Sequence, residues 1–461
     1  MRDDDRAFRE IIELKNIRAP DFMNGIRLSL CCACAMMLHS SQIWAADFRA
    51  MLFAIPEANS LQPEVLSERI EDGVKVQELL LSGPDFQGSP TKIYAWYAFP
   101  LKPGKYPGVV QLHGSGLQKL EPGPAIGYAR ENYACLSIDW AGEDWKAEGK
   151  PRSQPRSDFR SSGNHGRFVP DGSGDPKKGH WVAVPPEESS ITNGVRFVRR
   201  AFQYLRSRSE VDGEKLCLSG MSAGAHLALL VLQCEPDLKA AAIKYGSGYI
   251  RELNWGGYFG PLSRSDKAGT ERWLTALDPK HGLAQAKAAT LILTGTDDIF
   301  FFLPAVLATW RALPEPKGLL VLPNDNHGQV SNEKIPRQWF SHILENRPTW
   351  PKVDQPQADL TAKELKVSVN TTNNISQMDF WYKRQPAAEF FWGKSKNPDS
   401  STVWKKSAAV RKDGGRWEAS LPPFQEGEQI IVYALATGED GVQASSDTLE
   451  IPDYPSWRKT E

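Results

Sequence analysis

The sequence has little net charge and none of the familiar nucleotide-binding or metal-binding motifs. Its 461 residues carry 55 basic and 56 acidic side chains, which gives a formal net charge of −1. A nucleic-acid-binding protein usually shows a strong basic excess, so no nucleic-acid partner is predicted. The chain also lacks a phosphate-binding glycine loop, a dinucleotide fingerprint and a metal-like cluster of cysteine and histidine, so we expect no cofactor and no metal site.

Cysteine is rare, and its placement predicts no disulfide framework. Three of the six cysteines lie within the first 46 residues. The other three are an odd number at irregular spacing, which matches neither a disulfide scaffold nor a zinc motif. Cys135 and Cys217 stand in apolar, strand-like runs, so we expect them to be buried as small hydrophobic side chains.

The first 46 residues have the pattern of a secretory signal behind a polar extension. Residues 1–22 are mostly polar and charged. Met23 and Arg27 then precede an uncharged stretch at 28–38, and the segment ends in two alanines. A basic start, a short apolar stretch and small residues at the cleavage site are typical of a signal peptide, and the stretch is too short to span a bilayer. We predict translation from Met23, cleavage near Ala45, a secreted or periplasmic protein, and no membrane span in the mature chain.

Strands and helices are predicted to alternate between residues 74 and 346. The clearest helix is 189–208, where apolar residues recur at steps of 4, 3, 4 and 3. Short apolar strands that alternate with such helices predict a mostly parallel sheet covered on both faces. The expected strands are 74–81, 92–99, 106–112, 133–140, 215–219, 238–245, 289–295 and 318–323, and the expected helices are 124–132, 189–208, 223–233, 303–313 and 333–345.

The length of the chain predicts more than one domain. Residues 47–346 would form the α/β domain, with insertions at 143–188 and 249–288. Their scattered aromatic residues favour ordered caps or binding loops. Residues 347–361 contain three prolines and are predicted to be a linker. In residues 362–461, short alternating strands are divided by turn signals without a helical stretch, which predicts a small antiparallel, immunoglobulin-like sandwich.

The segment Gly220-Met-Ser222-Ala-Gly224 carries the clearest chemical signal. It follows an expected strand and precedes a helix rich in alanine and leucine, which is the context of a nucleophile elbow. The glycines permit the cramped turn that raises the serine hydroxyl above the sheet edge. A free serine hydroxyl is a weak nucleophile and needs a base within hydrogen-bond reach. We therefore predict that Ser222 is a nucleophile with a nearby base.

The partners of Ser222 are predicted at the ends of two later strands. His327 lies in the loop after the last expected strand, at the carboxyl edge where such sheets assemble their sites. The acid should lie between the serine and the histidine in chain order, and Asp297 and Asp298 end the preceding strand. Asp298 has the usual spacing from Gly295 and is predicted to orient His327 as general base. Asp297 is the alternative, and otherwise would cap the turn.

An oxyanion hole is predicted from two backbone segments. The first donor is the N–H of Ala223, directly after the nucleophile. The second should come from the loop His113-Gly-Ser-Gly116, where the N–H of Ser115 or Gly114 is the candidate. A structural role for His113, holding this loop in place, is the alternative to contact with the substrate.

With these motifs in place, residues 74–346 resemble an α/β-hydrolase of the dienelactone hydrolase and acetyl xylan esterase branch. The segments Gly295-Thr-Asp-Asp298-Ile-Phe-Phe and Leu322-Pro-Asn-Asp-Asn-His327 are also similar to PhoPQ-activated pathogenicity-related proteins, which are exported relatives with a β-rich tail. Dienelactone hydrolases use a cysteine nucleophile, whereas this chain has Ser222. The resemblance therefore implies a serine carboxylesterase that works through an acyl-enzyme, with a carbohydrate (acetyl) ester as its substrate.

Two other functions fit parts of the pattern. A prolyl oligopeptidase-like serine peptidase would use the same triad, but no propeller-length region precedes the expected α/β domain. A non-catalytic glycan-binding protein on a hydrolase scaffold is the second alternative. The complete set of serine, aspartate and histidine favours an enzyme over such a binding protein. The candidate glycan contacts in the β domain are Trp381, Trp392, Trp404 and Trp417. The favoured alternative is that most of these rings pack the core of the β domain, which then serves as a spacer.

Overall fold

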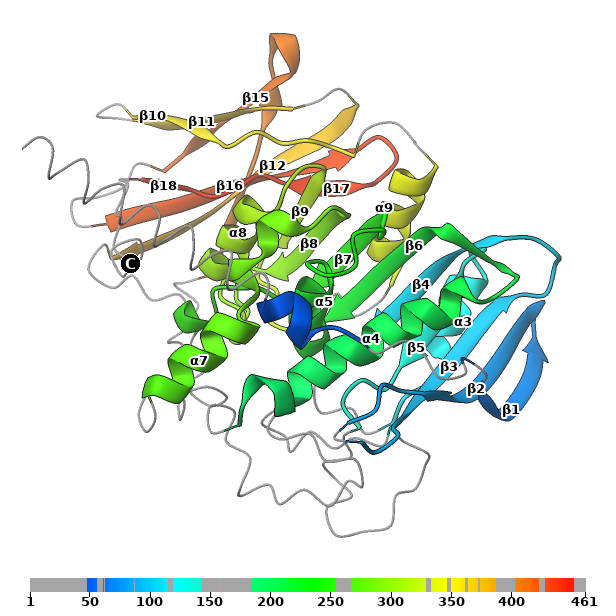
Figure 1. The fold of residues 1–461 in the computed structure, drawn as a ribbon. Coiled ribbons are helices and arrows are strands. Elements are labelled where there is room, and N and C mark those ends of the chain that lie inside the picture. The colour runs from blue at the N-terminus through cyan, green and yellow to red at the C-terminus, as the bar shows by residue number, and fades with distance from the viewer. Residues whose placement is uncertain are drawn as a thin grey trace, which may run out of the picture. The chain divides into compact units, whose positions relative to one another are not determined.

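Figure 1 shows the computed structural model of the chain, which divides into two compact units, residues 1–51 and 52–461. The residues of the predicted signal, Ser115, Trp392 and nearly all of the insertion 143–188 lie outside the described part of the chain. Of the first unit, residues 48–51 are described, and they are helical. The structure describes residues 48–55, 61, 63–86, 88–114, 119–142, 157, 184–253, 267–328, 333–345, 350–360, 364–371, 374–386, 403–422 and 428–451.

A nine-stranded sheet forms the centre of the second unit. Its strands are β1 (Glu64–Glu71), β2 (Val74–Ser82), β3 (Lys92–Pro100), β4 (Tyr106–Leu112), β5 (Ala134–Ile138), β6 (Val211–Met221), β7 (Ala240–Lys244), β8 (Ala289–Gly295) and β9 (Lys317–Leu322). They stand in the order β1-β2-β3-β5-β4-β6-β7-β8-β9. The first three strands pair antiparallel, and β4 to β9 pair parallel with one another. This mostly parallel sheet confirms the predicted fold class.

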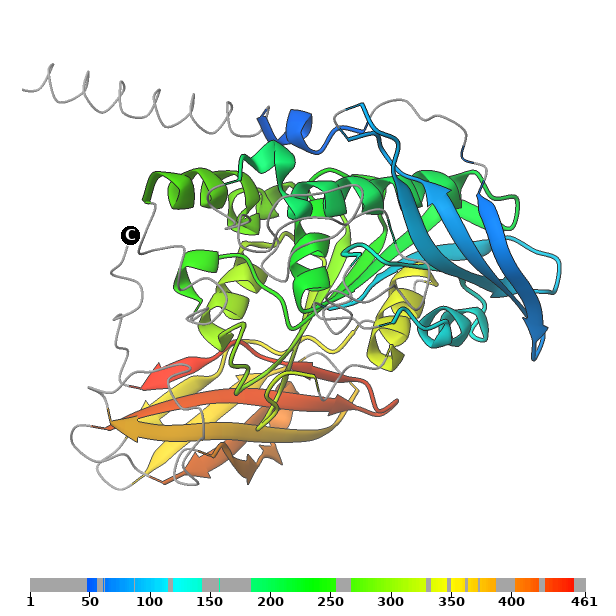
Figure 2. The same cartoon turned by 90° about the horizontal axis from the view of Figure 1, so that it is seen from below.

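Helices cover both faces of this sheet, which explains why its central strands are apolar without alternation. Helices α4 (Ser190–Arg206) and α5 (Ala223–Val231) pack on one face, and α3 (Gly123–Ala129) and α9 (Lys334–Leu344) pack on the other (Figure 2). Every residue of β5, β7 and β8 is buried as a result. Helix α8 (Leu303–Ala312) packs on β8. None of the described helices is both long enough and apolar enough to cross a bilayer.

The predicted elements of this domain are present, with shifted ends. The strand predicted at 215–219 begins earlier, at Val211, and the helix predicted at 124–132 ends earlier, at Ala129. Strand β1 was not predicted, because nearly all of its residues are exposed and no buried face produces an alternating pattern. The second insertion is partly helical, since α7 (Lys267–Leu277) lies within it and buries Trp273.

The C-terminal region consists of two antiparallel sheets. One has the order β10-β11-β15-β14 and the other β13-β12-β16-β17, with β18 paired to β16. Apolar residues from both sheets, among them Val367, Phe380, Trp417 and Val432, form one shared core, so the predicted sandwich is confirmed. Strand β10 falls inside the segment 347–361 that the sequence assigns to the linker. The strands are β10 (Gln357–Leu360), β11 (Leu365–Asn370), β12 (Ile375–Pro386), β13 (Lys405–Ala408), β14 (Val410–Arg411), β15 (Arg416–Leu421), β16 (Glu428–Gly438), β17 (Gln443–Ser445) and β18 (Leu449–Ile451).

Candidate active site

Ser222 stands on a tight turn between β6 and α5, as a nucleophile elbow requires. Its backbone has φ 55° and ψ −121°, a region that costs a non-glycine residue about 1–3 kcal/mol. The turn depends on close backbone approaches at both flanking glycines. A Cβ on Gly220 would lie 2.5 Å from the carbonyl oxygen of Gly224, and a Cβ on Gly224 would lie 2.3 Å from the carbonyl oxygen of His113. Glycine is therefore required at both positions of the motif.

The three predicted triad residues are joined by hydrogen bonds. The Ser222 hydroxyl lies 2.9 Å from His327 Nε2, and His327 Nδ1 lies 3.0 Å from Asp298 Oδ2. The other carboxylate oxygen of Asp298 accepts hydrogen bonds from the backbone N–H groups of Phe300 and Phe301, at 2.8 and 3.0 Å. These bonds fix the carboxylate, so that Nδ1–H of His327 donates to it and Nε2 is free to accept the serine proton.

The two neighbouring aspartates face different partners. The carboxylate of Asp297 accepts a hydrogen bond from the Thr296 hydroxyl at 3.1 Å. Burial raises the pKa of Asp297, while the nearby charge of Lys383 and the Thr296 hydrogen bond act in the opposite direction. Asp298 is the one that contacts His327, as its spacing from Gly295 predicts.

Three aromatic rings surround the imidazole of His327, and sequence reasoning missed all of them. The ring centroid of Phe300 lies 4.8 Å from that of His327, Phe301 is stacked at 6.1 Å, and Tyr245 lies at 5.2 Å. The Tyr245 hydroxyl donates to Asp325 Oδ2 at 2.5 Å, which ties the ring to the loop that carries His327. Only the apolar run after Asp298, which includes both phenylalanines, gave a sequence signal for this enclosure.

The backbone segments that carry two of the predicted oxyanion donors, Ala223 and Gly114, lie next to Ser222. Ala223 is the first residue of α5, and the first N–H groups of a helix have no partner within the helix. A Cβ on Gly114 would lie 3.2 Å from Ser222 Cβ and 3.8 Å from its Oγ, so the Gly114 backbone passes directly beside the nucleophile. Ser115, the other candidate, lies outside the described residues.

His113 holds the Gly114 segment from behind. Its Nδ1 lies 2.6 Å from the Gly114 carbonyl oxygen, and its ring stacks on Trp140 with centroids 5.5 Å apart. The indole N–H of Trp140 donates to the His113 carbonyl oxygen at 2.8 Å. Nε2 of His113 lies 3.6 Å from the buried carboxylate of Asp139. These contacts support the structural role for His113.

A second charged cluster lies buried behind the elbow, and it was not predicted from the sequence. Glu333, directly before α9, forms an ion pair with Lys244 at the end of β7. The other oxygen of Glu333 accepts hydrogen bonds from Ser219 at 2.7 Å and Tyr128 at 2.8 Å. Burial alone would raise the pKa of Glu333, but the ion pair and these hydrogen bonds outweigh it and lower the pKa. The sequence feature that could have indicated this cluster is Lys244 at the end of an otherwise apolar strand, because a buried lysine needs a partner.

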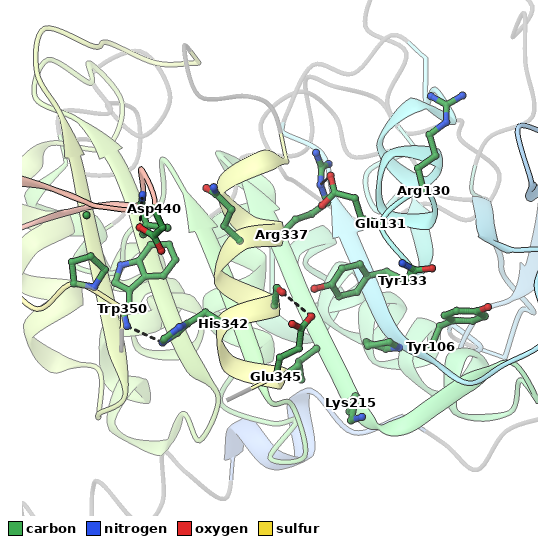
Figure 3. A pocket seen from close by; sticks show the side chains of 18 of the residues that line it. Tyr106, Arg130, Glu131, Tyr133, Lys215, Arg337, His342, Glu345, Trp350 and Asp440 are labelled. Carbon is green, nitrogen blue, oxygen red and sulfur yellow. Dashed lines mark hydrogen bonds and ion pairs between the residues drawn. The ribbon is translucent and has the colours of Figure 1, made fainter. Parts of the chain in front are cut away.

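Two cavities differ in their distance from the triad. A cavity of about 430 Å³ lies between α3 and α9 and includes Gly114 and Met221, so it adjoins the nucleophile. A larger cavity of about 1070 Å³ contains no triad residue and lies toward the edge of the sheet where β4 begins, beside the C-terminal sandwich (Figure 3). The smaller cavity is the nearer of the two to Ser222, but Ser222, Asp298 and His327 line neither of them, and Lys244 and Glu333 also line the smaller one. The side chains that line the larger cavity include Tyr106, Lys215, Arg337, His342, Trp350 and Asp440.

In the described part of the chain, no group of three or more His, Cys, Asp or Glu side chains is placed to hold a metal ion. The three cysteines that the structure describes, Cys135, Cys217 and Cys234, are free thiols. Cys135 and Cys217 are fully buried in β5 and β6, and burial raises the pKa of both thiols.

Comparisons with known proteins connect this geometry to two families. The family model of acetyl xylan esterase (AXE1) matches residues 54–254, which include Ser222 and Gly114. The model of the PhoPQ-activated pathogenicity-related protein matches residues 224–391, which include Asp298 and His327. No curated protein sequence matches the chain.

Solved structures show the same fold. The acetyl xylan esterase from Paenibacillus sp. R4 is 19% identical with a TM-score of 0.51, covering 66% of this chain and 94% of its own. Acetyl xylan esterase 1 from Thermoanaerobacterium sp. JW/SL YS485 is 16% identical with a TM-score of 0.53, covering 65% of this chain and 93% of its own. Together with the strand order, these likenesses establish an α/β-hydrolase fold.

Proposed function

We propose that this chain, an α/β-hydrolase of the acetyl xylan esterase-like esterase family, hydrolyses carboxylic esters with Ser222 as its nucleophile. The observation that carries the proposal is the continuous hydrogen-bonded path from Ser222 through His327 to the buried Asp298. A serine on a strained turn, a histidine on its hydroxyl and a carboxylate on that histidine are the arrangement that activates serine for acyl transfer.

The reaction follows from these positions. Ser222 Oγ attacks the ester carbonyl while His327 Nε2 takes its proton, and Asp298 stabilises the imidazolium that forms. The N–H groups of Ala223 and Gly114 are placed to stabilise the negative charge on the former carbonyl oxygen. His327 then gives its proton to the leaving alcohol, which leaves an acyl group on Ser222. A water molecule, deprotonated by His327, attacks this acyl-enzyme and releases the acid and the free serine.

For the substrate, we propose an acetyl ester of a carbohydrate. The support is the acetyl xylan esterase match and the names of the two structural relatives. We also propose export through the signal at residues 23–46, which would bring the enzyme to polymeric glycans. Acetate release from acetylated xylan is the direct test. Cleavage of simple esters without release of acetate from acetylated glycans would refute the substrate while leaving the esterase intact.

The first experiment compares the wild-type chain with Ser222→Ala, using p-nitrophenyl acetate hydrolysis and labelling by a fluorophosphonate. We expect turnover to fall by roughly 10⁴-fold or more and labelling to disappear, because the variant removes the attacking oxygen. Ser219→Ala is the matched control, since Ser219 lies on the same strand but donates to Glu333. It should still be labelled. Labelling that persists in Ser222→Ala would place the nucleophile elsewhere.

The glycan-binding alternative has little support from the sandwich. Trp404 is 2% exposed and Trp417 is 7% exposed, so both rings are buried in the domain and present no flat face to a sugar. Trp381 is partly buried, and Trp392 lies outside the described residues. An enzyme therefore remains the function that the geometry supports best.

A further inference from the structure

We infer that the C-terminal sandwich supports the catalytic site by positioning the two loops that carry Asp298 and His327. The inference rests on the proposed esterase function. It assigns the sandwich a role other than glycan binding or spacing, and it identifies Asn324 as the main positioning residue.

Asn324 connects the histidine loop to the sandwich. It lies between the end of β9 and His327, with a left-handed backbone at φ 55° that asparagine adopts more readily than most residues. Its amide nitrogen donates to the carbonyl oxygen of Trp404 at 3.1 Å, and its amide oxygen accepts from the N–H of Trp404 at 2.9 Å. One side chain therefore pairs with both backbone groups of a residue in the other domain.

The partner of Asn324 is a rigid point of the sandwich. Trp404 precedes β13 and is 2% exposed. Its ring packs edge to face on that of Tyr433 in β16, with centroids 5.4 Å apart. Tyr433 is fully buried on the face of β16 opposite the sandwich core, so the residue at position 404 is anchored on that strand by packing of its ring. A hydrogen bond to such a point limits the movement of the loop that receives it.

The same asparagine also joins the two catalytic loops to each other. Its backbone N–H donates to the Thr296 hydroxyl at 2.8 Å, and that hydroxyl donates to Asp297 at 3.1 Å. The N–H of Asp297 in turn donates to the carbonyl oxygen of Asp325 at 2.9 Å. The path from Trp404 thus reaches the residue beside Asp298 on one loop and the residues before His327 on the other.

The sandwich also places a positive charge, that of Lys383, near Asp297, the carboxylate that does not contact His327. Lys383 of β12 lies within electrostatic reach of Asp297; burial lowers the pKa of this lysine, and attraction to Asp297 opposes that shift. Burial and the charge of Asp297 both raise the pKa of Tyr433, a second residue of the sandwich that interacts with this carboxylate. A cation here offsets the negative charge of Asp297, which stands directly beside the triad carboxylate.

Two further contacts dock the sandwich away from the catalytic loops, and they make a matched control possible. The Ser445 hydroxyl accepts from the N–H of Val321 in β9 at 2.9 Å. Arg311 at the end of α8 forms two hydrogen bonds to Asp447, at 2.6 and 2.7 Å. Replacement of Arg311 weakens the same domain interface without touching Asn324, Asp297 or His327.

The test compares Asn324→Gly with Arg311→Ala in the full-length protein. Glycine tolerates the left-handed backbone and removes the whole side chain with its two hydrogen bonds to Trp404, so we expect kcat to fall between about tenfold and 10²-fold with KM unchanged, as for a misplaced catalytic group. Arg311→Ala should lower the melting temperature at least as much as Asn324→Gly but leave kcat within about twofold. Wild-type kcat in Asn324→Gly, or a loss of kcat in both variants that follows their loss of stability, would overturn the inference.

Hydrogen exchange separates this inference from the esterase proposal. Amides of residues 322–328 should exchange faster in Asn324→Gly than in the wild type, and Arg311→Ala should leave them unchanged. Exchange of this segment at the wild-type rate in Asn324→Gly would contradict the inference. A wild-type protein that neither hydrolyses esters nor reacts with the fluorophosphonate would refute the esterase, while the exchange result would still decide whether the sandwich holds the loop.

Discussion

The triad and the buried cluster behind it are built from the same kinds of group. In the triad, a carboxylate, a basic side chain and a serine hydroxyl meet as Asp298, His327 and Ser222. In the cluster, the carboxylate of Glu333 lies between Lys244 and Ser219, with Tyr128 as a second hydroxyl. Both serines come from the end of β6, three positions apart in the sequence. The two regions nevertheless have opposite roles.

Access and the nature of the base make the difference. The side chain of His327 is 15% exposed, whereas that of Lys244 is 1% exposed. Imidazole can take and return a proton near neutral pH, and the serine hydroxyl points at its free nitrogen. In the cluster the serine hydroxyl points at a carboxylate that is already paired with a fixed positive charge. We therefore propose that the chemistry takes place at the triad, where the polar groups are more open to a substrate, and that the cluster gives structural support.

Among the tests of this comparison, the largest expected change is the loss of kcat on replacement of Asp298. Asp298→Asn should lower kcat by about 10⁴-fold, because the amide favours the wrong imidazole tautomer. The matched variant Asp297→Asn removes the adjacent carboxylate, which does not contact His327, and should lower kcat less than about tenfold. Steady-state kinetics with p-nitrophenyl acetate measure both. Equal losses in the two variants would show that the aspartates share the role.

The next largest effect is a loss of stability at the buried cluster. Glu333→Gln leaves Lys244 buried without its counter-charge, so we expect about 3–5 kcal/mol less free energy of unfolding, measured by urea denaturation. Fluorophosphonate labelling of the remaining folded protein should continue, since the variant leaves the triad in place. A stable but unlabelled Glu333→Gln protein would mean that the cluster takes part in the chemistry.

A double variant is the control for this prediction. Lys244→Met removes the uncompensated charge, so Glu333→Gln with Lys244→Met should be less destabilised than Glu333→Gln alone. If the double variant loses as much stability as the sum of the two single variants, the ion pair is not the source of the effect.

The smallest effect is a change in the response to acid. The pKa of Glu333 is lower in the folded protein than its ordinary value of 4.5. A lowered carboxylate pKa contributes stability that is fully present above the unfolded pKa and is lost as the pH falls through the folded pKa. The difference in unfolding free energy between wild type and Glu333→Gln should therefore shrink as the pH falls below about 4.5. A constant difference down to acidic pH would contradict the assignment.

The triad could be predicted from the sequence because each of its residues has a local signal. Ser222 has its flanking glycines, and Asp298 and His327 each follow an apolar strand, so the parallel sheet brings them to one edge. The buried ion pair could not be predicted in the same way, because Lys244 and Glu333 are 89 residues apart and only the fold selects the pair.

The sandwich was predictable as a domain but its role was not. Alternating strands and turn signals identify an antiparallel domain wherever they occur. The contact between Asn324 and Trp404 spans 80 residues and uses the backbone of Trp404, so the identity of that side chain carries no information about it. Strand β1 was missed for a simpler reason, since a strand that is exposed on both faces has no alternating pattern.

The position of the sandwich has a consequence for the solubility of the protein. The two outer strands of a sheet present unpaired backbone groups that can recruit a second copy and begin aggregation. At one end, β1 carries four charged side chains in eight residues, which discourages such pairing. At the other end, the Ser445 hydroxyl forms hydrogen bonds with both backbone groups of Val321, and β17 lies along β9. The outer edge of β9 is therefore covered by the sandwich. The sandwich thereby also covers the edge of the sheet at which a second copy could pair.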